Sequence, residues 1–320
     1  MPFAMLMCGV ALSCSKSKTS TDSGSPITDQ LNIKYGSNVS WTGTLQDLHV
    51  DIYQPANATT KSKNPFVLMI HGGTFLTGTK ENLAKMCRIL ADSGFVAASL
   101  EYRLGWNSGS GNCNGDTLSN KMAVYRSLQD ANAAMRFIVA NASNYGIDPN
   151  YLFVGGNSAG AVIADNLAYI TEAQAPLFSP TVYNALGPLT SATNTLTNKF
   201  AIKGVASMWG ALIDSNLIVP TNAVPMLFYH GSADQVIPVD VGTYGTCPNY
   251  PKLFGTLCMD RRLHKANVAS VVNILIGGGH GPDEYTDAFL APNIACFFHR
   301  IVRATPIVSQ VFTGVVNSCR

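Results

Sequence analysis

The stretch YLFVGGNSAGAVIA, residues 151–164, decides the fold class of this 320-residue chain. Its first four residues are apolar and suit a buried strand, and the residues from Ala159 onward suit the start of a helix. Between them, residues 156–160 match the pattern G-x-S-x-G. A serine at such a strand-to-helix turn lies on a strained elbow, with its hydroxyl above the edge of the sheet. We therefore predict that Ser158 is a nucleophile with a helix N-terminus behind it.

Apolar runs on either side of this stretch predict strands and helices in alternation. Continuous apolar runs predict buried strands at residues 64–70, 95–102, 151–154, 203–209, 225–230 and 270–276. Spacing of three or four residues predicts helices at 81–93, 118–140, 159–170 and 293–302. Residues 31–35 and 47–53 alternate like antiparallel strands. The pattern indicates an α/β fold, with a mostly parallel sheet and helices on both faces.

A serine hydroxyl needs a base, and His280 is the best placed of the six histidines. It follows an apolar run and three glycines, which puts it on a loop after the last predicted strand. We predict Asp234 as the acid that orients the imidazole, because it lies in a turn directly after the apolar strand 225–230. Alternative acids are Asp240, Asp283 and Glu284.

The segment His71-Gly72-Gly73-Thr74-Phe75 follows the predicted strand 64–70 and resembles an HGGG-type oxyanion loop. We predict that the backbone N–H groups of Gly73, Thr74 and Ala159 hold the negative oxygen of a tetrahedral intermediate. Thr74 stands where the motif has its third glycine, and this departure from the pattern bears on which amides form the oxyanion hole. Candidate walls of the substrate pocket, with core packing as the equally good alternative, are Trp106, Asn157, Met208, Trp209 and Leu212.

Seven motifs together resemble bacterial carboxylesterases of the hormone-sensitive-lipase and carboxylesterase branch of the α/β-hydrolases. They are HGGTF (71–75), EYRL (101–104), DANAAMRF (130–137), YGIDP (145–149), GNSAG (156–160), HGSAD (230–234) and GGGH (277–280). The resemblance extends over about residues 45–302. It implies the α/β-hydrolase fold, ester hydrolysis through an acyl-enzyme without a cofactor, and the triad Ser158, Asp234 and His280. The order serine, acid, histidine along the chain is the order of this fold.

Other functions remain as alternatives. An acetyl or feruloyl esterase acting on plant polysaccharides is a subtype of the same chemistry, whereas a peptidase of this fold and a non-catalytic binding module are true rivals. The substrate we expect is a small or glycan-linked ester.

Charged residues make up only 12% of the chain and the net charge is +2, so no basic face for nucleic acid is predicted. No cysteine or histidine group has zinc spacing, so we predict no metal site.

The first residues are typical of an exported protein. Residues 3–12 form a short apolar run, and residues 11–14 resemble a bacterial lipobox in which Cys14 would be lipidated. We therefore expect a signal peptide at 1–14 and a flexible tether at 15–30. The catalytic domain would span 31–320, with insertions at about 171–200 and 239–262, the first being a candidate cap. The protein would be a periplasmic or outer-membrane lipoprotein, or secreted; the alternative is a wrongly assigned start.

Cysteine usage agrees with export. Two of the eight cysteines belong to the leader, and an even number in the rest of an exported chain predicts disulfides. Cys247 and Cys258 flank a short loop and make the best local pair. Cys296 with Cys319 would pin the C-terminal tail, which leaves Cys87 with Cys113 by elimination. The alternative is that they are buried free thiols.

Overall fold

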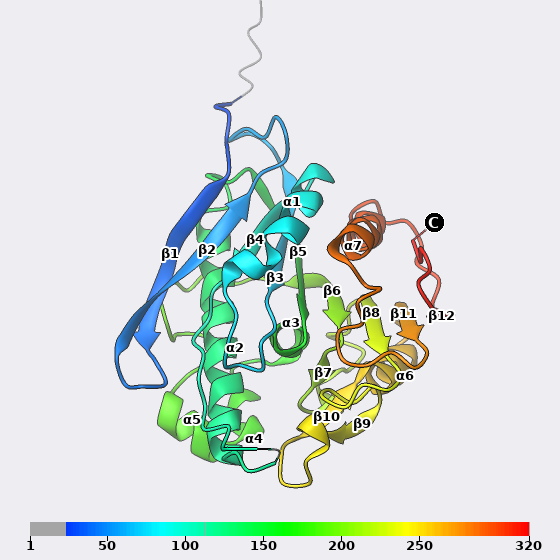
Figure 1. The fold of residues 1–320 in the computed structure, drawn as a ribbon. Coiled ribbons are helices and arrows are strands. Elements are labelled where there is room, and N and C mark those ends of the chain that lie inside the picture. Colours follow the sequence, from blue (N-terminus) through cyan, green and yellow to red (C-terminus); the bar gives the residue numbers. More distant parts are fainter. Residues whose placement is uncertain (1–23, 112, 320) are drawn as a thin grey trace, which may run out of the picture.

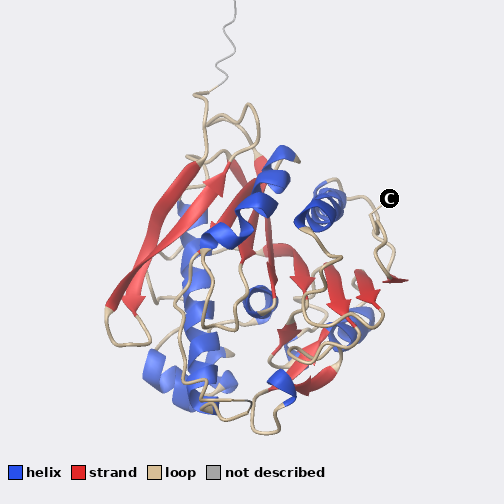
Figure 2. Cartoon of the chain, viewed as in Figure 1, coloured by secondary structure: helices blue, strands red, loops and turns tan. Residues whose placement is uncertain are grey.

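The computed structural model describes residues 24–111 and 113–319 and contains the predicted layered α/β arrangement (Figures 1 and 2). Nine strands form one sheet in the order β1-β2-β4-β3-β5-β6-β8-β11-β12. Their bounds are β1 (Gln30–Val39), β2 (Leu45–Tyr53), β3 (Asn64–Ile70), β4 (Val96–Leu100), β5 (Ile147–Asn157), β6 (Ile202–Met208), β8 (Met226–Gly231), β11 (Ser270–Leu275) and β12 (Gln310–Thr313). Strand β2 is antiparallel to β1 and to β4, and the other neighbours are parallel.

Helices cover both faces of the sheet. Their bounds are α1 (Ala84–Asp92), α2 (Thr117–Ala140), α3 (Ala159–Tyr169), α4 (Ala175–Phe178), α5 (Pro180–Leu186), α6 (Thr256–Lys265) and α7 (Asp287–Val302), with 3-10 turns η1 (Lys80–Leu83), η2 (Ser215–Leu217) and η3 (Tyr244–Thr246). Helix α7 begins earlier than the predicted 293–302, because the Thr286 side chain caps it by accepting from Phe289 N–H. None of the helices in the described part of the chain has the length and apolar character needed to cross a membrane.

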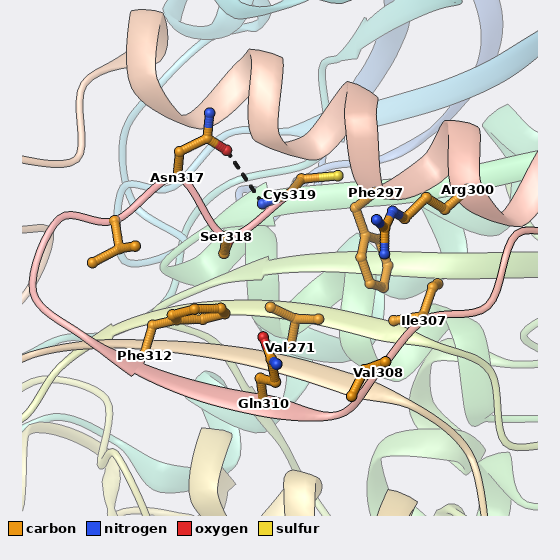
Figure 3. A pocket seen from close by; sticks show the side chains of 11 residues that line it. Val271, Phe297, Arg300, Ile307, Val308, Gln310, Phe312, Asn317, Ser318 and Cys319 are labelled. Atoms are coloured by element: carbon orange, nitrogen blue, oxygen red, sulfur yellow. Dashed lines mark hydrogen bonds between the residues drawn. The ribbon is translucent and has the colours of Figure 1, made fainter.

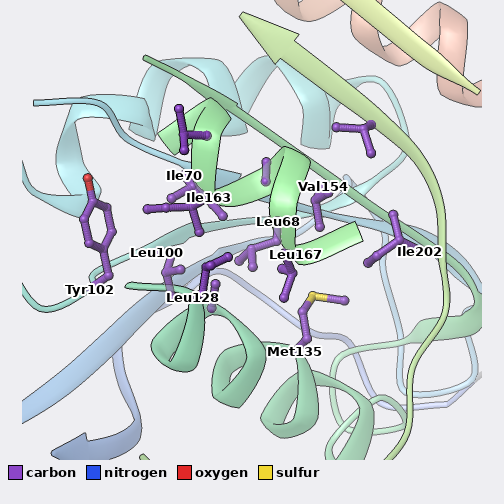
Figure 4. Close-up of a cluster of buried hydrophobic side chains, with 14 of the residues drawn as sticks. Leu68, Ile70, Leu100, Tyr102, Leu128, Met135, Val154, Ile163, Leu167 and Ile202 are labelled. Carbon is purple, nitrogen blue, oxygen red and sulfur yellow. The ribbon is translucent and has the colours of Figure 1, made fainter. Parts of the chain in front are cut away.

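Two apolar cores follow from the alternation of side chains along the strands. Leu68 and Ile70 of β3 face the core beneath α2 and α3, while Val67 and Met69 face the core beneath α1 and α7. Figure 4 shows the first core, where Leu128 of α2 lies close to the sheet. Because both faces of the strands are buried, their sequences read as continuous apolar runs, which is why these strands were predictable.

The two predicted insertions take different forms. Residues 171–200 contain α4, α5 and a loop that is fastened to α2, where the Arg136 guanidinium donates to the carbonyl of Ala192 (2.6 Å). Residues 239–262 contribute to a second, three-stranded sheet in the order β7-β10-β9. Its strands are β7 (Ala211–Leu212), β10 (Lys252–Gly255) and β9 (Val241–Thr243). No sequence pattern predicted this sheet, because its strands are too short to show a period.

The C-terminal tail completes the sheet edge. Strand β12 pairs with β11, and the tail then returns to α7, where the predicted disulfide Cys296–Cys319 is confirmed. A cavity of about 450 Å³ lies between the tail, Val271 and Phe297 (Figure 3). None of the predicted catalytic residues lines this cavity.

The other two predicted disulfides are wrong. The structure pairs Cys113 with Cys247, at a Cα–Cα distance of 5.2 Å, and leaves Cys87 and Cys258 as buried free thiols. Cys87 belongs to the core under α1 and α7, whereas Cys113 lies on the loop before α2 and packs against the other core. Between Cys247 and Cys258 the chain passes through β10, which separates the two thiols. The leader and Cys14 lie outside the described residues.

Candidate active site

Ser158 lies at the sharp turn between β5 and α3, as predicted for an elbow. Its φ of 55° and ψ of −123° are strained for a residue with a side chain. The flanking glycines are required by close packing: a Cβ on Gly160 would overlap the carbonyl oxygen of Ile70, and one on Gly156 would lie 2.5 Å from the Gly160 carbonyl. The sequence therefore forces the turn that presents the Ser158 hydroxyl at the carboxyl end of β5.

The structure brings the three predicted triad residues together. His280 Nε2 lies 2.7 Å from Ser158 Oγ, and His280 Nδ1 lies 2.7 Å from Asp234 Oδ2. His280 comes from the loop after β11 and Asp234 from the loop after β8. An ionised carboxylate only accepts hydrogen bonds, so Nδ1 donates to it and Nε2 is free to accept the serine proton. Ser158 is only 8% exposed, which keeps the reacting oxygen in a partly dry site.

Asp234 is held by more partners than the sequence suggested. Its Oδ1 accepts from the backbone N–H groups of Val236 (2.7 Å) and Ile237 (3.0 Å), and His230 Nε2 lies 3.3 Å from its Oδ2. Burial opposes ionisation of Asp234, but hydrogen bonds from His230, His280 and Val236 outweigh it and hold the pKa of this carboxyl well below its usual range. Asp234 therefore carries the negative charge that the imidazolium needs.

His230, near the end of β8, is a buried residue of the site that was not among the predicted site residues. Its Nδ1 lies 2.9 Å from the Thr256 hydroxyl, and its Nε2 lies 3.1 Å from the carbonyl oxygen of Ile237. Because a carbonyl accepts, Nε2 carries a proton, and it also faces Asp234 Oδ2 at 3.3 Å. The sequence signal that could have found it is its position four residues before Asp234, at the start of the HGSAD motif.

The alternative acids lie elsewhere. Asp240 pairs with the exposed Arg261 at 2.5 Å, and Asp283 and Glu284 are exposed. None of these three carboxylates is bonded to His280 within the described residues. The geometry thus selects Asp234.

Backbone bonds orient the predicted oxyanion donors. His71 Nδ1 donates to the Gly72 carbonyl (2.7 Å), and the Gly73 carbonyl accepts from the N–H groups of Leu76 (2.8 Å) and Thr77 (3.0 Å). In a trans peptide the N–H points opposite to the carbonyl, so the N–H groups of Gly73 and Thr74 point away from these bonds. Within residues 24–111 and 113–319, the N–H groups of Gly73, Thr74 and Ala159 have no acceptor. Three donors are therefore unpaired around the nucleophile, as an oxyanion hole needs.

This orientation depends on unusual backbone angles. Gly73, Thr74 and Phe75 have φ values of 111°, 56° and 61°. Only glycine adopts such angles without strain, so the loop stores strain at the two residues with side chains. Thr74 stands where the motif has its third glycine, and its hydroxyl donates to the Gly73 carbonyl (2.7 Å).

The five predicted pocket residues have different positions. Trp209 lies beside His280, with ring centroids 6.4 Å apart, and is the one whose ring contacts a triad residue. The Oδ1 of Asn157 accepts from Gly72 N–H (2.8 Å) and ties the elbow to the oxyanion loop. Met208 and Leu212 are fully buried, Met208 in the core beneath α1 and α7 and Leu212 in the core beneath α2 and α3. Trp106 lies behind the oxyanion loop, where its indole N–H donates to the Thr74 carbonyl (3.0 Å).

Among the described residues, no group of three His, Cys, Asp or Glu side chains is arranged to hold a metal ion. The chemistry that the described side chains support is acyl transfer. A base lies within hydrogen-bond distance of the nucleophile, a carboxylate orients the base, and unpaired backbone N–H groups lie on the oxyanion loop and at the start of α3.

Comparisons with known proteins agree with this geometry. The family model described as BD-FAE matches residues 50–212. Carboxylesterase 3B of Mus musculus is 31% identical over 131 residues, which are 41% of this chain and 22% of that protein. Carboxylesterase 1C of Rattus norvegicus is 28% identical over 170 residues, 53% of this chain and 29% of that protein. The chain thus spans less than a third of these curated relatives.

Solved structures extend the likeness to the whole fold. Thermogutta terrifontis esterase 2 phosphorylated by paraoxon superposes with a TM-score of 0.56 at 18% identity, covering 83% of this chain and 94% of that one. A truncated carbohydrate esterase from gut microbiota has a TM-score of 0.59 at 17% identity, covering 87% and 98%. The chain has the predicted α/β-hydrolase fold.

Proposed function

The chain belongs to the BD-FAE family, and from this premise we propose that it is a serine hydrolase that cleaves carboxylic esters. The observation that carries the proposal is the unbroken line of hydrogen bonds from Asp234 through His280 to Ser158, with 2.7 Å at each step. A serine, a histidine and a buried carboxylate in this arrangement are the machinery of acyl transfer. Esterase relatives among the curated proteins support the choice of ester over peptide.

The reaction follows from the positions of the groups. Ser158 Oγ attacks the ester carbonyl carbon while His280 Nε2 takes its proton, and Asp234 stabilises the imidazolium. The N–H groups of Gly73, Thr74 and Ala159 then hold the oxygen that becomes negative, each worth about 3 kcal/mol in the transition state. His280 returns the proton to the leaving alcohol, and water activated by the same imidazole hydrolyses the acyl-enzyme.

For the substrate we propose an ester with a small acyl group, free or attached to a glycan. One structural neighbour is an esterase solved with butyrate bound, and another is a carbohydrate esterase. The second of these supports the subtype in which the alcohol part is a polysaccharide, with acetyl or feruloyl as the acyl group. A panel of p-nitrophenyl esters, acetylated xylan, feruloylated oligosaccharides and proline-ended peptides separates these cases from a peptidase.

The direct test is hydrolysis of p-nitrophenyl butyrate by the wild type and by Ser158→Ala. We expect the substitution to lower kcat by at least about 10⁴-fold, because the base and the acid cannot act without the nucleophile. Paraoxon should add one diethylphosphoryl group to the wild type, detected by intact mass, and none to Ser158→Ala. Unchanged hydrolysis in a folded Ser158→Ala protein would contradict the assignment.

We propose further that the protein is exported and lipidated at Cys14. Its support is the apolar leader with the lipobox-like residues 11–14, together with two disulfides in the described part of the chain. Expression of the full chain in a bacterial host should place it in the membrane fraction with a mass that shows a lipidated Cys14, and Cys14→Ala should release it. An unmodified chain that retains Met1 would refute this proposal.

A further inference from the structure

A second network lies behind the oxyanion loop, in the segment that follows β4. Gly105 N–H donates to the Phe75 carbonyl (2.7 Å), and Trp106 Nε1 donates to the Thr74 carbonyl (3.0 Å). These carbonyls belong to the two consecutive residues with φ of 56° and 61°. Strained backbone of this kind persists only where its surroundings hold it. The two bonds hold the strained turn from the side away from the triad.

Trp106 is itself fixed by aromatic partners from the second insertion. It is 5% exposed, and its ring meets the rings of Tyr244 and Tyr250 edge-on, with centroids 6.3 and 5.9 Å apart. The Tyr250 hydroxyl accepts from Gly115 N–H at 2.7 Å. A Cβ on Gly115 would approach both Tyr250 and Trp106 within 2.6 Å, so there is no space for a side chain at this position.

A covalent link joins the two segments that build this network. Cys113 lies on the loop that also carries Trp106, and it is bonded to Cys247 of the second insertion, 134 residues away. The Thr117 hydroxyl also donates to the Asn249 carbonyl (2.7 Å). In Figure 1 the loop before α2 and the loop between β9 and β10 lie at the same end of the molecule. The disulfide thus fastens Tyr244 and Tyr250 against the tryptophan.

We propose that Trp106 is a positioning residue for the oxyanion donors and that the Cys113–Cys247 disulfide keeps it in place. This rests on the proposed esterase function. The Thr74 carbonyl that Trp106 holds lies in the peptide plane that follows the one carrying the Thr74 N–H, and the two planes meet at the Thr74 Cα. Release of the indole bond therefore lets the φ and ψ of Thr74 change, which misaligns that donor. Negative charge forms on the ester carbonyl oxygen only at the tetrahedral stage. A misaligned donor should therefore lower kcat and leave KM unchanged.

Trp106→Phe tests the hydrogen bond, because it keeps an aromatic ring and removes the N–H donor. We expect kcat for p-nitrophenyl butyrate to fall about tenfold, with KM within about twofold of the wild type. The inhibition constant of an aryl trifluoromethyl ketone, which forms a tetrahedral adduct with the serine, should rise by a similar factor. Trp41→Phe is the matched control: this half-exposed ring packs on Gly105 of the same segment and should change neither value.

The disulfide is tested with two double variants. Cys113→Ser/Cys247→Ser should lower kcat about three- to tenfold and weaken the ketone in parallel, whereas Cys296→Ser/Cys319→Ser, at the tail, should leave both unchanged. All assays run well below the lowest Tm of the set. If the first variant does not fold, phosphine reduction of folded Cys296→Ser/Cys319→Ser protein opens the remaining described disulfide instead.

The results separate the two proposals. A wild type that neither hydrolyses esters nor reacts with paraoxon refutes the esterase function itself. An active wild type combined with wild-type kcat and ketone affinity in Trp106→Phe overturns the positioning role of Trp106. Loss of kcat in Trp106→Phe without any loss on opening Cys113–Cys247 overturns the part assigned to the disulfide.

Discussion

The acid–base side of the active site consists of side chains, whereas its oxyanion side consists of backbone N–H groups. Asp234 and His280 lie on two neighbouring loops and are joined by side-chain hydrogen bonds to a charged carboxylate. Gly73 and Thr74 present backbone amides, and these are oriented by hydrogen bonds to the carbonyls of the preceding residues, Gly72 and Gly73, and by a network that reaches residue 247. The first side depends on a few strong contacts, and the second depends on many weaker ones.

This difference predicts how each side fails. Removing the carboxylate from the buried Asp234–His280–Ser158 hydrogen bonds leaves the base without the partner that fixes its tautomer, so a single substitution there is severe. A backbone donor cannot be deleted by changing a side chain, and it is held by several bonds, so single substitutions there should have graded effects. The two sides should therefore separate in the size of their mutational losses.

The largest effect is expected at Asp234. Asp234→Asn keeps the shape but makes the residue neutral, so His280 loses the partner that fixes its tautomer and stabilises its charged form. We expect kcat/KM for p-nitrophenyl butyrate to fall about 10⁴-fold at pH 7. Asp240→Asn is the matched control, since that carboxylate pairs with Arg261 at the surface and should leave the rate unchanged. A large loss in the control would mean that the acid has been misassigned.

The same contrast explains what could be predicted from the sequence. Ser158, Asp234 and His280 each follow a strand with a clear apolar run, so local patterns and chain order were enough to find them. The partner of Cys113 was missed because it depends on which loops meet at the carboxyl end of the sheet, and no local pattern encodes that meeting. For Met208 and Leu212 the sequence left pocket and core equally open, because position near a strand end does not tell which way a side chain points.

Asp165 offers a test of whether burial alone makes a carboxyl catalytic. It is fully buried on α3, its Oδ2 accepts from the Ser207 hydroxyl (2.8 Å), and within the described residues its Oδ1 has no partner. Burial, only partly offset by the Ser207 bond, raises the pKa of Asp165 to about 8. Unlike Asp234, it has no histidine partner among the described residues and should be neutral at pH 7.

We therefore expect Asp165→Asn to alter stability and not kcat. Between the ordinary pKa of 3.8 and about 8, the folded protein holds a proton that the unfolded chain has lost. The contribution of this proton to the free energy of unfolding is fully present below pH 3.8. It decreases by about 1 kcal/mol per pH unit as the pH rises toward about 8, and above that pH it is lost. Urea unfolding at pH 5.5 and 7.5 should show a smaller decrease for Asp165→Asn than for the wild type. Equal decreases would show that Asp165 is ionised in the folded protein.

The smallest effect is expected at Thr74, where the amide and not the hydroxyl is the proposed donor. The hydroxyl is turned toward the Gly73 carbonyl, which two backbone N–H groups already bind, so Thr74→Ala should keep kcat/KM within about threefold of the wild type. Thr74→Gly should be as active and about 1 kcal/mol more stable than Thr74→Ala, since glycine adopts the φ of 56° without strain. Ester kinetics and urea unfolding of the two variants measure both values. If Thr74→Ala loses as much activity as Trp106→Phe, the hydroxyl itself takes part, and the oxyanion side would depend on a side chain as the acid–base side does.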